Sequence, residues 1–573
     1  MRNPGRAAYA SSPALRETVA PPAGEALPLP VTIGTVSGWV HGTGARGVLM
    51  CGASGFEGAA AYQSWRILAD LIAARGYTVL RFDYPNEGDS GDVPEPRAEA
   101  AVAAIRAVNA WLTNLTGTAP DVVSLRLGSL LATNALAGSK APQRHAMLAP
   151  ITSGRSYLRE MKAAARLFAA TPGRETTLVT EGITLCGHAL TEADCRSIEA
   201  LGWSATPSRL LTVLPDGLAA PALCENAEHL DFPGYAAMMS PAEAMPPMVA
   251  FNTIAGWFQA SPERNTQPLP PTSPIHGPDF VETRLRFGPD DRLAGTWCEP
   301  PGGAATVVIL PNAGANARFG WARMAVDLAR LLAQHGVASL RLDLTGIGDS
   351  TWSAAGPRAS VYALAHDDDI DSAIRLAQVH GATRIILAGL CSGGYLALRA
   401  GDRNAAVSSV IAANVLKLTW RHGVDDLDTI ERTSNQASRV YGAQALSTSA
   451  WKRLLTGEIA PQRVLAVAGL FAGRFARALA ARVGYDGLVP EDARKARAML
   501  QRLARRGVAV NFVHSALDAS RDEIDRLFGS DGRFLAALGN CSTDIIPESD
   551  HEFSPKNARD RFGKLLLDRA LKA

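Results

Sequence analysis

Cys391 is the residue whose surroundings best fit a chemical role. It follows an apolar β-type run, stands in Gly-Leu-Cys-Ser-Gly at residues 389–393, and directly precedes a helical pattern. A strand that turns sharply into a helix exposes the residue at the turn, and the flanking glycines avoid collisions with neighbouring backbone. Unpaired N–H groups at a helix start favour the thiolate form of cysteine. The pattern therefore predicts a cysteine nucleophile.

A nucleophile on such a turn needs a base, an acid that orients the base, and donors for an oxyanion. In this arrangement the acid and then the histidine follow the nucleophile along the chain. Asp518 follows a strand pattern and His551 precedes the last helical pattern, so we expect both to form a triad with Cys391. Asp522 and Asp525 are alternatives for the acid, but they lie where a helix should already have begun.

The oxyanion hole is expected to use two backbone N–H groups. One belongs to Ser392, directly after the nucleophile. The other belongs to the loop after the first buried strand, where Asn312 or Ala313 is the expected donor and Gly314 provides the bend. The candidate site is therefore Cys391 with these donors.

One segment of the chain occurs twice. Residues 76–90 read GYTVLRFDYPNEGDS, and residues 336–350 read GVASLRLDLTGIGDS, an offset of 260 residues. A period this long indicates duplicated domains rather than a solenoid. Each copy alternates β-type and helix-type segments, which predicts the α/β class, with two mostly parallel sheets flanked by helices.

The composition of the segments between the copies divides the chain. We expect a flexible segment at 1–30, a first domain at 31–259, a linker rich in Pro, Ser and Thr at 260–278, and a second domain at 279–573. Within the second domain the alternation stops at about residue 415 and helical patterns follow to about 506, so this stretch is predicted to be a helical cap over the site.

The first copy carries Arg126 where the second carries Cys391. An arginine keeps its proton and cannot attack a carbonyl, so the first domain is predicted to be non-catalytic. Asp216 fits the acid position, but the segment before the final helix holds no histidine, and His229 lies earlier. Arg126 either binds a carboxylate, phosphate or sugar acid, or is ion-paired and inert; the second is favoured because an unused pocket needs no ligand.

Composition excludes several classes of protein. The 573 residues carry a net charge of +2 at pH 7, which argues against a dedicated nucleic-acid surface. No apolar run reaches about 18 residues, so no membrane span is predicted. The N-terminus lacks an apolar signal sequence, and seven scattered cysteines without a Cys-x-x-Cys pair fit a reducing cytoplasm rather than disulfides or a metal site. Oligomeric state is not predicted.

Both halves resemble the α/β-hydrolase superfamily. More narrowly, they resemble the serine-aminopeptidase-like hydrolases encoded with exosortase and exopolysaccharide gene clusters. The first half, through residues 125–128 and 148–158, is similar to the "hydrolase 2" type, which also carries arginine at this turn. The second half is similar to the companion type in four segments, at 341–350, 389–393, 416–423 and 451–458. The resemblance covers most of residues 35–260 and 280–570 and implies no cofactor, but Cys391 replaces the serine of most hydrolases.

The expected function is hydrolysis or transfer of an acyl group from an ester or thioester, small or carrier-bound, through an acyl group on Cys391. Two alternatives stay open. Polyhydroxyalkanoate synthases and dienelactone hydrolases also place cysteine in Gly-x-Cys-x-Gly, although as single catalytic domains. The third reading is a non-catalytic tandem scaffold in a biosynthetic pathway. Neither the acyl donor nor the acceptor follows from the sequence.

Overall fold

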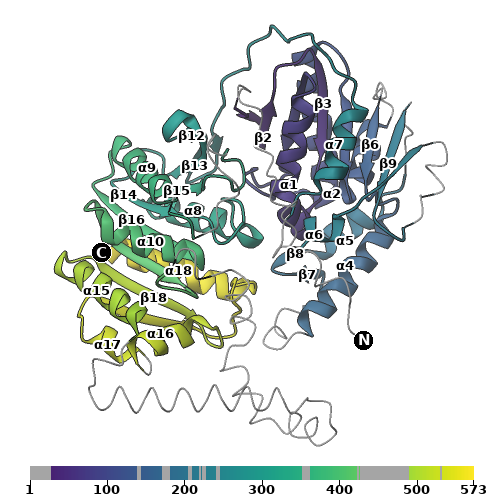
Figure 1. Ribbon diagram of the computed structural model, residues 1–573. Coiled ribbons are helices and arrows are strands. Elements are labelled where there is room, and N and C mark those ends of the chain that lie inside the picture. Colours follow the sequence, from purple (N-terminus) through teal and green to yellow (C-terminus); the bar gives the residue numbers. More distant parts are fainter. Residues whose placement is uncertain are drawn as a thin grey trace, which may run out of the picture.

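A computed structural model of the protein contains two bodies, each built on a sheet (Figure 1). The structure describes residues 27–137, 144–170, 181–203, 209–218, 221, 227–240, 245–351, 362–364, 366–421, 425, 490–529 and 532–572. Most of the expected flexible segment at 1–30 and most of the expected cap lie outside these residues. No described helix is both long and apolar enough to cross a membrane.

The first sheet has eight strands in the order β1-β2-β4-β3-β5-β6-β9-β10. β2 is antiparallel to both β1 and β4, and all the remaining neighbours are parallel. Helices α2, α3 and α4 pack on one face, and α1, α6 and α7 on the other. The strands are β1 (Leu29–Ile33), β2 (Val36–His41), β3 (Arg46–Cys51), β4 (Tyr77–Phe82), β5 (Asp121–Leu125), β6 (His145–Leu148), β9 (Leu210–Leu214) and β10 (Glu228–Asp231).

The helices of the first half are α1 (Gly55–Ala73), α2 (Arg97–Thr116), α3 (Leu127–Leu136), α4 (Gly154–Ala169), α5 (Glu192–Glu199), α6 (Tyr235–Met238) and α7 (Met248–Trp257). Between β6 and β9 the chain leaves the sheet and forms α4, α5 and a two-stranded hairpin. The hairpin pairs β7 (Ile183–Leu185) with β8 (His188–Leu190), and its turn is Cys186-Gly187. Figure 1 shows this hairpin at the end of the first half that faces the second.

The second sheet has nine strands in the order β11-β12-β13-β15-β14-β16-β17-β18-β19. Helices α9, α10, α15, α16 and α17 pack on one face, and α8 and α18 on the other. The strands are β11 (Ile275–His276), β12 (Val281–Phe287), β13 (Leu293–Glu299), β14 (Thr306–Leu310), β15 (Ala338–Asp343), β16 (Arg384–Leu390), β17 (Val407–Ala413), β18 (Ala509–Ser515) and β19 (Cys541–Ile546). The helices are η4 (Pro289–Asp291), η5 (Trp321–Arg323), α8 (Met324–Gln334), α9 (His366–Val379), α10 (Ser392–Arg403), α15 (Glu491–Arg505), α16 (Ser520–Phe528), α17 (Arg533–Ala536) and α18 (Lys556–Lys572).

Burial patterns explain these elements. Central strands such as β14 are apolar on both faces because helices cover both. In α15 the buried residues Ala493, Ala496, Leu500 and Leu503 recur at helical spacing and join the core beneath α9 and α10. The α15 helix therefore covers the face of the sheet, whereas the sequence placed it at the end of the cap.

The fold class expected from the sequence is confirmed, because both sheets are mostly parallel and flanked by helices. Their strand orders also agree: the order of the first sheet recurs in the second, which adds β11 at its edge. The segment predicted as a linker joins the two sheets and is held by backbone bonds, with the Ser261 N–H donating to Arg75 O (2.9 Å) and the Asn265 N–H to Thr43 O (2.8 Å).

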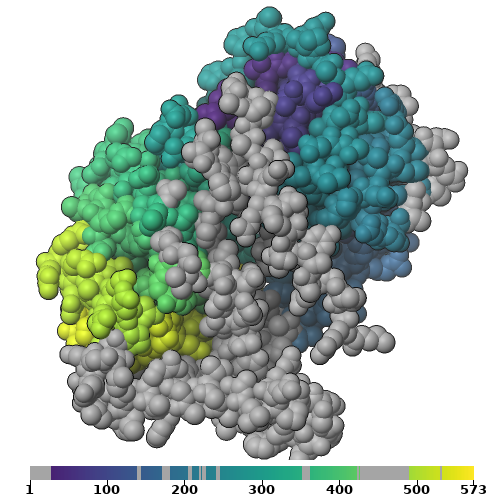
Figure 2. Space-filling model, viewed as in Figure 1, coloured from purple at the N-terminus to yellow at the C-terminus, as the bar shows by residue number. Residues whose placement is uncertain are grey.

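Figure 2 shows the two halves side by side. Matched positions of the repeated segment join them. Arg81 of the first copy binds Asp349 of the second, and Arg341 of the second binds Asp89 of the first at 2.7 Å. Each arginine is the sixth residue of its copy and each aspartate the fourteenth. The contact is reciprocal, as in a dimer with twofold symmetry.

Arg318 links the carboxylates at the centre of this interface. Its Nη1 binds Asp343 at 2.6 Å and Asp349 at 2.7 Å, and its Nη2 lies 2.5 Å from Asp89, with all four side chains buried. Burial alone would raise the pKa of Asp349, but Arg81 and Arg318 outweigh it and lower that pKa. Because the loss of one member would leave a buried charge uncompensated, this network fixes how the halves are arranged.

Candidate active site

Cys391 lies on a strained turn between β16 and α10. Its backbone has φ 54° and ψ −120°, a conformation that side-chain-bearing residues rarely adopt. A Cβ on Gly389 would lie 2.2 Å from the backbone carbon of Gly393, and a Cβ on Gly393 would lie 2.6 Å from Asn312 O. Both glycines are therefore required by close backbone approach, as the sequence indicated.

His551 and Asp518 are brought together at the carboxyl end of the second sheet. His551 Nδ1 lies 2.8 Å from Asp518 Oδ2, and the other carboxylate oxygen accepts a 2.8 Å bond from the Ser520 N–H. The His551 contact and the bonds from Ser520 overcome burial and lower the pKa of Asp518. The carboxylate thus stays charged and fixes the orientation of the imidazole.

The pKa of His551 is raised well above its ordinary value. Burial acts to lower it, but the charge of Asp518 and then the interaction with Cys391 outweigh burial. The other ring nitrogen, Nε2, makes no hydrogen bond of ideal geometry within the described residues, which leaves it available beside the Cys391 sulfur. This arrangement favours the imidazolium form of His551.

The predicted oxyanion donors lie around the same turn. Ser392 begins α10, and its Oγ accepts a 2.9 Å bond from the Gly314 N–H, which ties the loop after β14 to the turn. The Asn312 side chain is used inside that loop, with Nδ2 donating to Asn316 O at 2.7 Å. Ala313 and Cys391 both pack against the same apolar cluster. The loop therefore lies against the turn that carries Cys391.

Two neighbours of the site carry no sequence motif. Asn414, at the end of β17, donates to His551 O (2.9 Å) and Ser515 Oγ (2.9 Å), and its Oδ1 accepts from the Ser515 N–H (2.8 Å). Tyr362 is buried and stacks on Trp420 with ring centroids 4.4 Å apart. Burial and then Cys391 raise the pKa of Tyr362, so its hydroxyl stays protonated.

Neither residue was found from the sequence. The available sequence signal was an asparagine directly after a strand. Asparagine tolerates the left-handed backbone that Asn414 adopts there, with φ 44°. Ala149 ends the matching strand of the first half and has the same φ of 44°. The asparagine is therefore a feature of the second half that backbone geometry alone does not require.

The first half keeps the turn without the nucleophile. Arg126 has φ 52° and ψ −123°, close to the values at Cys391. Its Nε binds Glu57 at 2.7 Å and its Nη2 binds Glu160 at 2.5 Å. Burial opposes the charge, but these carboxylates outweigh it and raise the pKa of Arg126. Of the two readings of Arg126, the ion-paired one agrees with these contacts.

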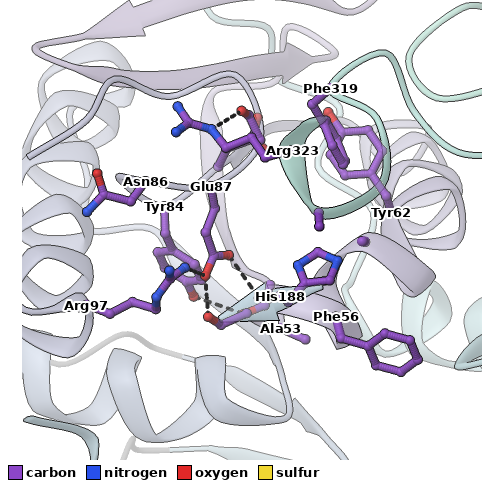
Figure 3. Close-up of a pocket in the computed structure, with 18 of the residues that line it drawn as sticks. Ala53, Phe56, Tyr62, Tyr84, Asn86, Glu87, Arg97, His188, Phe319 and Arg323 are labelled. Carbon is purple, nitrogen blue, oxygen red and sulfur yellow. Dashed lines mark hydrogen bonds and ion pairs between the residues drawn. The ribbon is translucent and has the colours of Figure 1, made fainter. Parts of the chain in front are cut away.

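In the first half, the loop that matches the predicted oxyanion loop is hydrogen-bonded to a carboxylate of the same half. The Glu87 carboxylate accepts hydrogen bonds from the Ser54 hydroxyl and, at 3.1 Å, from the Gly55 N–H (Figure 3). Arg97 binds the same carboxylate at 2.8 Å. An internal carboxylate therefore holds this loop through Ser54 and Gly55.

In the part of the chain that the structure describes, the two candidates of the first half, Asp216 and His229, do not pair with each other. Asp216 is exposed in the loop after β9, and His229 lies within β10, where its Nδ1 contacts Thr212 Oγ1. Within the described residues no group of His, Cys, Asp and Glu side chains is arranged to hold a metal ion in either half.

Residues 307–562 match the alpha/beta hydrolase family. This match and the strand order identify the α/β-hydrolase fold in the second half, and the first half shares that order. No curated protein matches the chain.

Several solved structures are similar to part of the chain. A dienelactone hydrolase from Anabaena variabilis has 13% identity over 50% of this chain and 96% of its own, with a TM-score of 0.29. An esterase from Pyrococcus furiosus has 12% identity over 53% and 96%, with a TM-score of 0.32. Brefeldin A esterase, described as a bacterial homologue of human hormone-sensitive lipase, has 16% identity over 53% and 80%, with a TM-score of 0.32.

Proposed function

We propose that the second half is an acyl hydrolase or acyltransferase that works through an acyl group on Cys391. The observation that carries the proposal is that Asp518 orients His551 and that the pKa of His551 is raised. Its Nδ1 is held 2.8 Å from the Asp518 carboxylate, and its pKa is raised by that carboxylate and by Cys391. An imidazole oriented in this way is poised to exchange a proton with a thiol.

The reaction has two stages. The Cys391 thiolate attacks the carbonyl carbon, and the carbonyl oxygen becomes an oxyanion facing the N–H groups of Ser392 and of Asn312 or Ala313. The intermediate then collapses, and His551 Nε2–H gives its proton to the departing alkoxide or thiolate. In the second stage water or another acceptor gives a proton to Nε2 and attacks the thioester, which regenerates the thiol–imidazole pair.

A thioester on Cys391 reacts with amines and thiols more readily, relative to water, than an oxygen ester does. The site could therefore transfer the acyl group to another acceptor as well as hydrolyse it. The acyl donor is a small molecule or is bound to a carrier. The resemblance to hydrolases of exopolysaccharide gene clusters supports a biosynthetic role. We further propose that residues 31–259 and 279–573 are tandem domains and that the first does not catalyse, because Arg126 is paired with Glu57 and Glu160.

The test is turnover of activated esters and acyl thioesters by the full chain, with and without an amine acceptor. We expect Cys391→Ala to abolish turnover. Cys541→Ala is the matched control, because Cys541 is also partly exposed while burial raises its pKa to about 12. Equal turnover in wild type and Cys391→Ala would remove the proposal, and no turnover in the wild type would favour the non-catalytic scaffold. Amide formation with the added amine would select transfer over hydrolysis.

A further inference from the structure

A residue of the catalytic half connects the first half to the loop that carries His551. Arg559, in the first turn of α18, donates through Nη1 to Ser554 O and through Nη2 to Gly187 O at 3.3 Å. Ser554 lies three residues after His551, and Gly187 forms the turn between β7 and β8 of the first half. One guanidinium therefore joins the hairpin to the loop at residues 547–555, here named the His551 loop.

Hydrogen bonds within the catalytic half also hold the His551 loop. Asn414 donates to His551 O, and the Ser515 hydroxyl donates to Asp550 O at 2.6 Å. The Ser554 N–H closes the loop on Asp550 Oδ1 at 2.7 Å. Arg559 donates a hydrogen bond to the carbonyl of the same Ser554 and also binds Gly187 of the first half.

The hairpin turn fits closely against this contact. Gly187 has φ +84°, and a Cβ placed there would lie 2.7 Å from Arg559 Nη1, 2.8 Å from Ser554 O and 3.1 Å from Ala322 Cβ. The arginine tip can move aside, but the Ser554 carbonyl is backbone and cannot move without shifting the His551 loop. Only glycine fits this turn.

Aromatic side chains fix the hairpin in place. His188, directly after Gly187, contacts Trp321 of the second half edge-to-face at 5.6 Å, and Phe56 contacts Trp321 in the same way at 5.8 Å. Burial, followed by Arg97 and Arg559, lowers the pKa of His188 to about 3, so it stays neutral. Figure 3 shows His188 beside Phe56 at the edge of this interface.

A cavity of about 330 Å³ lies beneath the hairpin and is lined by both halves. Three of its arginines are already bound to protein acceptors. Arg97 binds Glu87 at 2.8 Å, Arg323 donates to Gly88 O at 3.0 Å, and Arg559 makes the two bonds described above. All three guanidinium groups already have protein acceptors, and those of Arg323 and Arg559 join the two halves. The cavity therefore points to a structural joint rather than to an anion site.

We propose that the first half is a positioning domain for the catalytic histidine, acting through the Gly187 turn and Arg559 on the His551 loop. The inference rests on the proposed function of Cys391 and His551. It gives a role to a half that has lost its nucleophile. Arg559 and Gly187 are positioning residues, since they act through Ser554 and contact no reacting atom.

The test uses the full chain and measures the rate of Cys391 alkylation by iodoacetamide from pH 5.5 to 9. We expect Gly187→Ala and Arg559→Met to slow alkylation at pH 7 by about 10- to 100-fold, because displacement of about 1 Å in a catalytic group can cost about 100-fold. Arg559→Lys keeps one donor and should fall between wild type and Arg559→Met. Gly217→Ala is the matched control: Gly217 has φ +80° in the first half, and a Cβ there meets nothing within 4 Å.

The outcomes separate this inference from the proposed function. Unreactive Cys391 in the wild type would contradict the function itself. A reactive wild type whose pH profile is unchanged in Gly187→Ala, Arg559→Met and Arg559→Lys would contradict only the positioning role. Equal slowing in Gly217→Ala would assign the effect to general strain and also overturn the inference. If Gly187→Ala does not fold, the Arg559→Lys and Arg559→Met comparison decides alone.

Discussion

Replacing Asp518 by Asn should change the proton state of His551, while the side chain at position 518 keeps nearly the same shape. The Asp518 carboxylate lies 2.8 Å from His551 Nδ1 and accepts a 2.8 Å bond from the Ser520 N–H. In Asp518→Asn the amide oxygen is held by that N–H, so the NH₂ group faces Nδ1. The imidazole must then carry its proton on Nε2, and it can no longer accept the thiol proton there.

The magnitude follows from the same contacts. Loss of the orienting carboxylate costs about 10⁴-fold in kcat in a serine triad, and a thiol depends less on its base. For Cys391 we therefore expect alkylation at pH 6.5 to slow by about 10- to 100-fold, or about 1.4–2.7 kcal/mol in activation free energy. Because Asp518 raises the pKa of His551, the variant should lose its imidazolium at lower pH than the wild type.

The assay is alkylation of Cys391 by iodoacetamide, followed by peptide mass spectrometry across pH 5.5 to 9. Asp522→Asn is the matched control, because it removes a carboxylate from α16 and leaves the His551 contact intact. If the Asp518→Asn profile overlays that of the wild type, Asp518 does not set the proton state of His551. Equal slowing in both variants would show that local charge, rather than orientation of His551, sets the rate.

Three further perturbations test the framework around the site. Asn414→Ala should destabilise the fold by about 1–3 kcal/mol in urea titration, because it leaves the buried backbone of the His551 loop without its donor. Asp349→Asn should cost about 3–5 kcal/mol near pH 7 by uncoupling Arg81 and Arg318. Burial alone would raise the pKa of Asp349, but Arg81 and Arg318 outweigh it and lower that pKa. The difference in unfolding free energy between wild type and Asp349→Asn should therefore be present above pH 4 and shrink as pH falls further. Gly393→Ala should reduce soluble yield, because its Cβ would lie 2.6 Å from a loop carbonyl.

Much of the fold was predictable because it depends on local patterns. The strand and helix around Cys391 follow from an apolar run, two glycines and a helical period, each read within a dozen residues. The prediction that His551 pairs with Asp518 followed from chain order and from the place of each residue next to a predicted strand or helix. The α15 helix shows the limit of such patterns, since an amphipathic stripe is the same whether it covers a sheet or a pocket.

The contacts that remained hidden join residues far apart in the chain. Asn414 reaches His551 across 137 positions, and Arg559 reaches Gly187 across 372. Arg126 meets Glu57 across 69 positions. These bonds depend on the relative placement of whole helices and halves, which no local period encodes.

The central claim is that Cys391 carries the acyl group. Its most direct test is the intact mass of the full chain, quenched with acid after mixing with an activated ester, followed by peptide mapping. We expect one acyl adduct on Cys391, which hydroxylamine removes and Cys391→Ala lacks. An unmodified Cys391 under turnover, or an adduct that persists in Cys391→Ala, would contradict it.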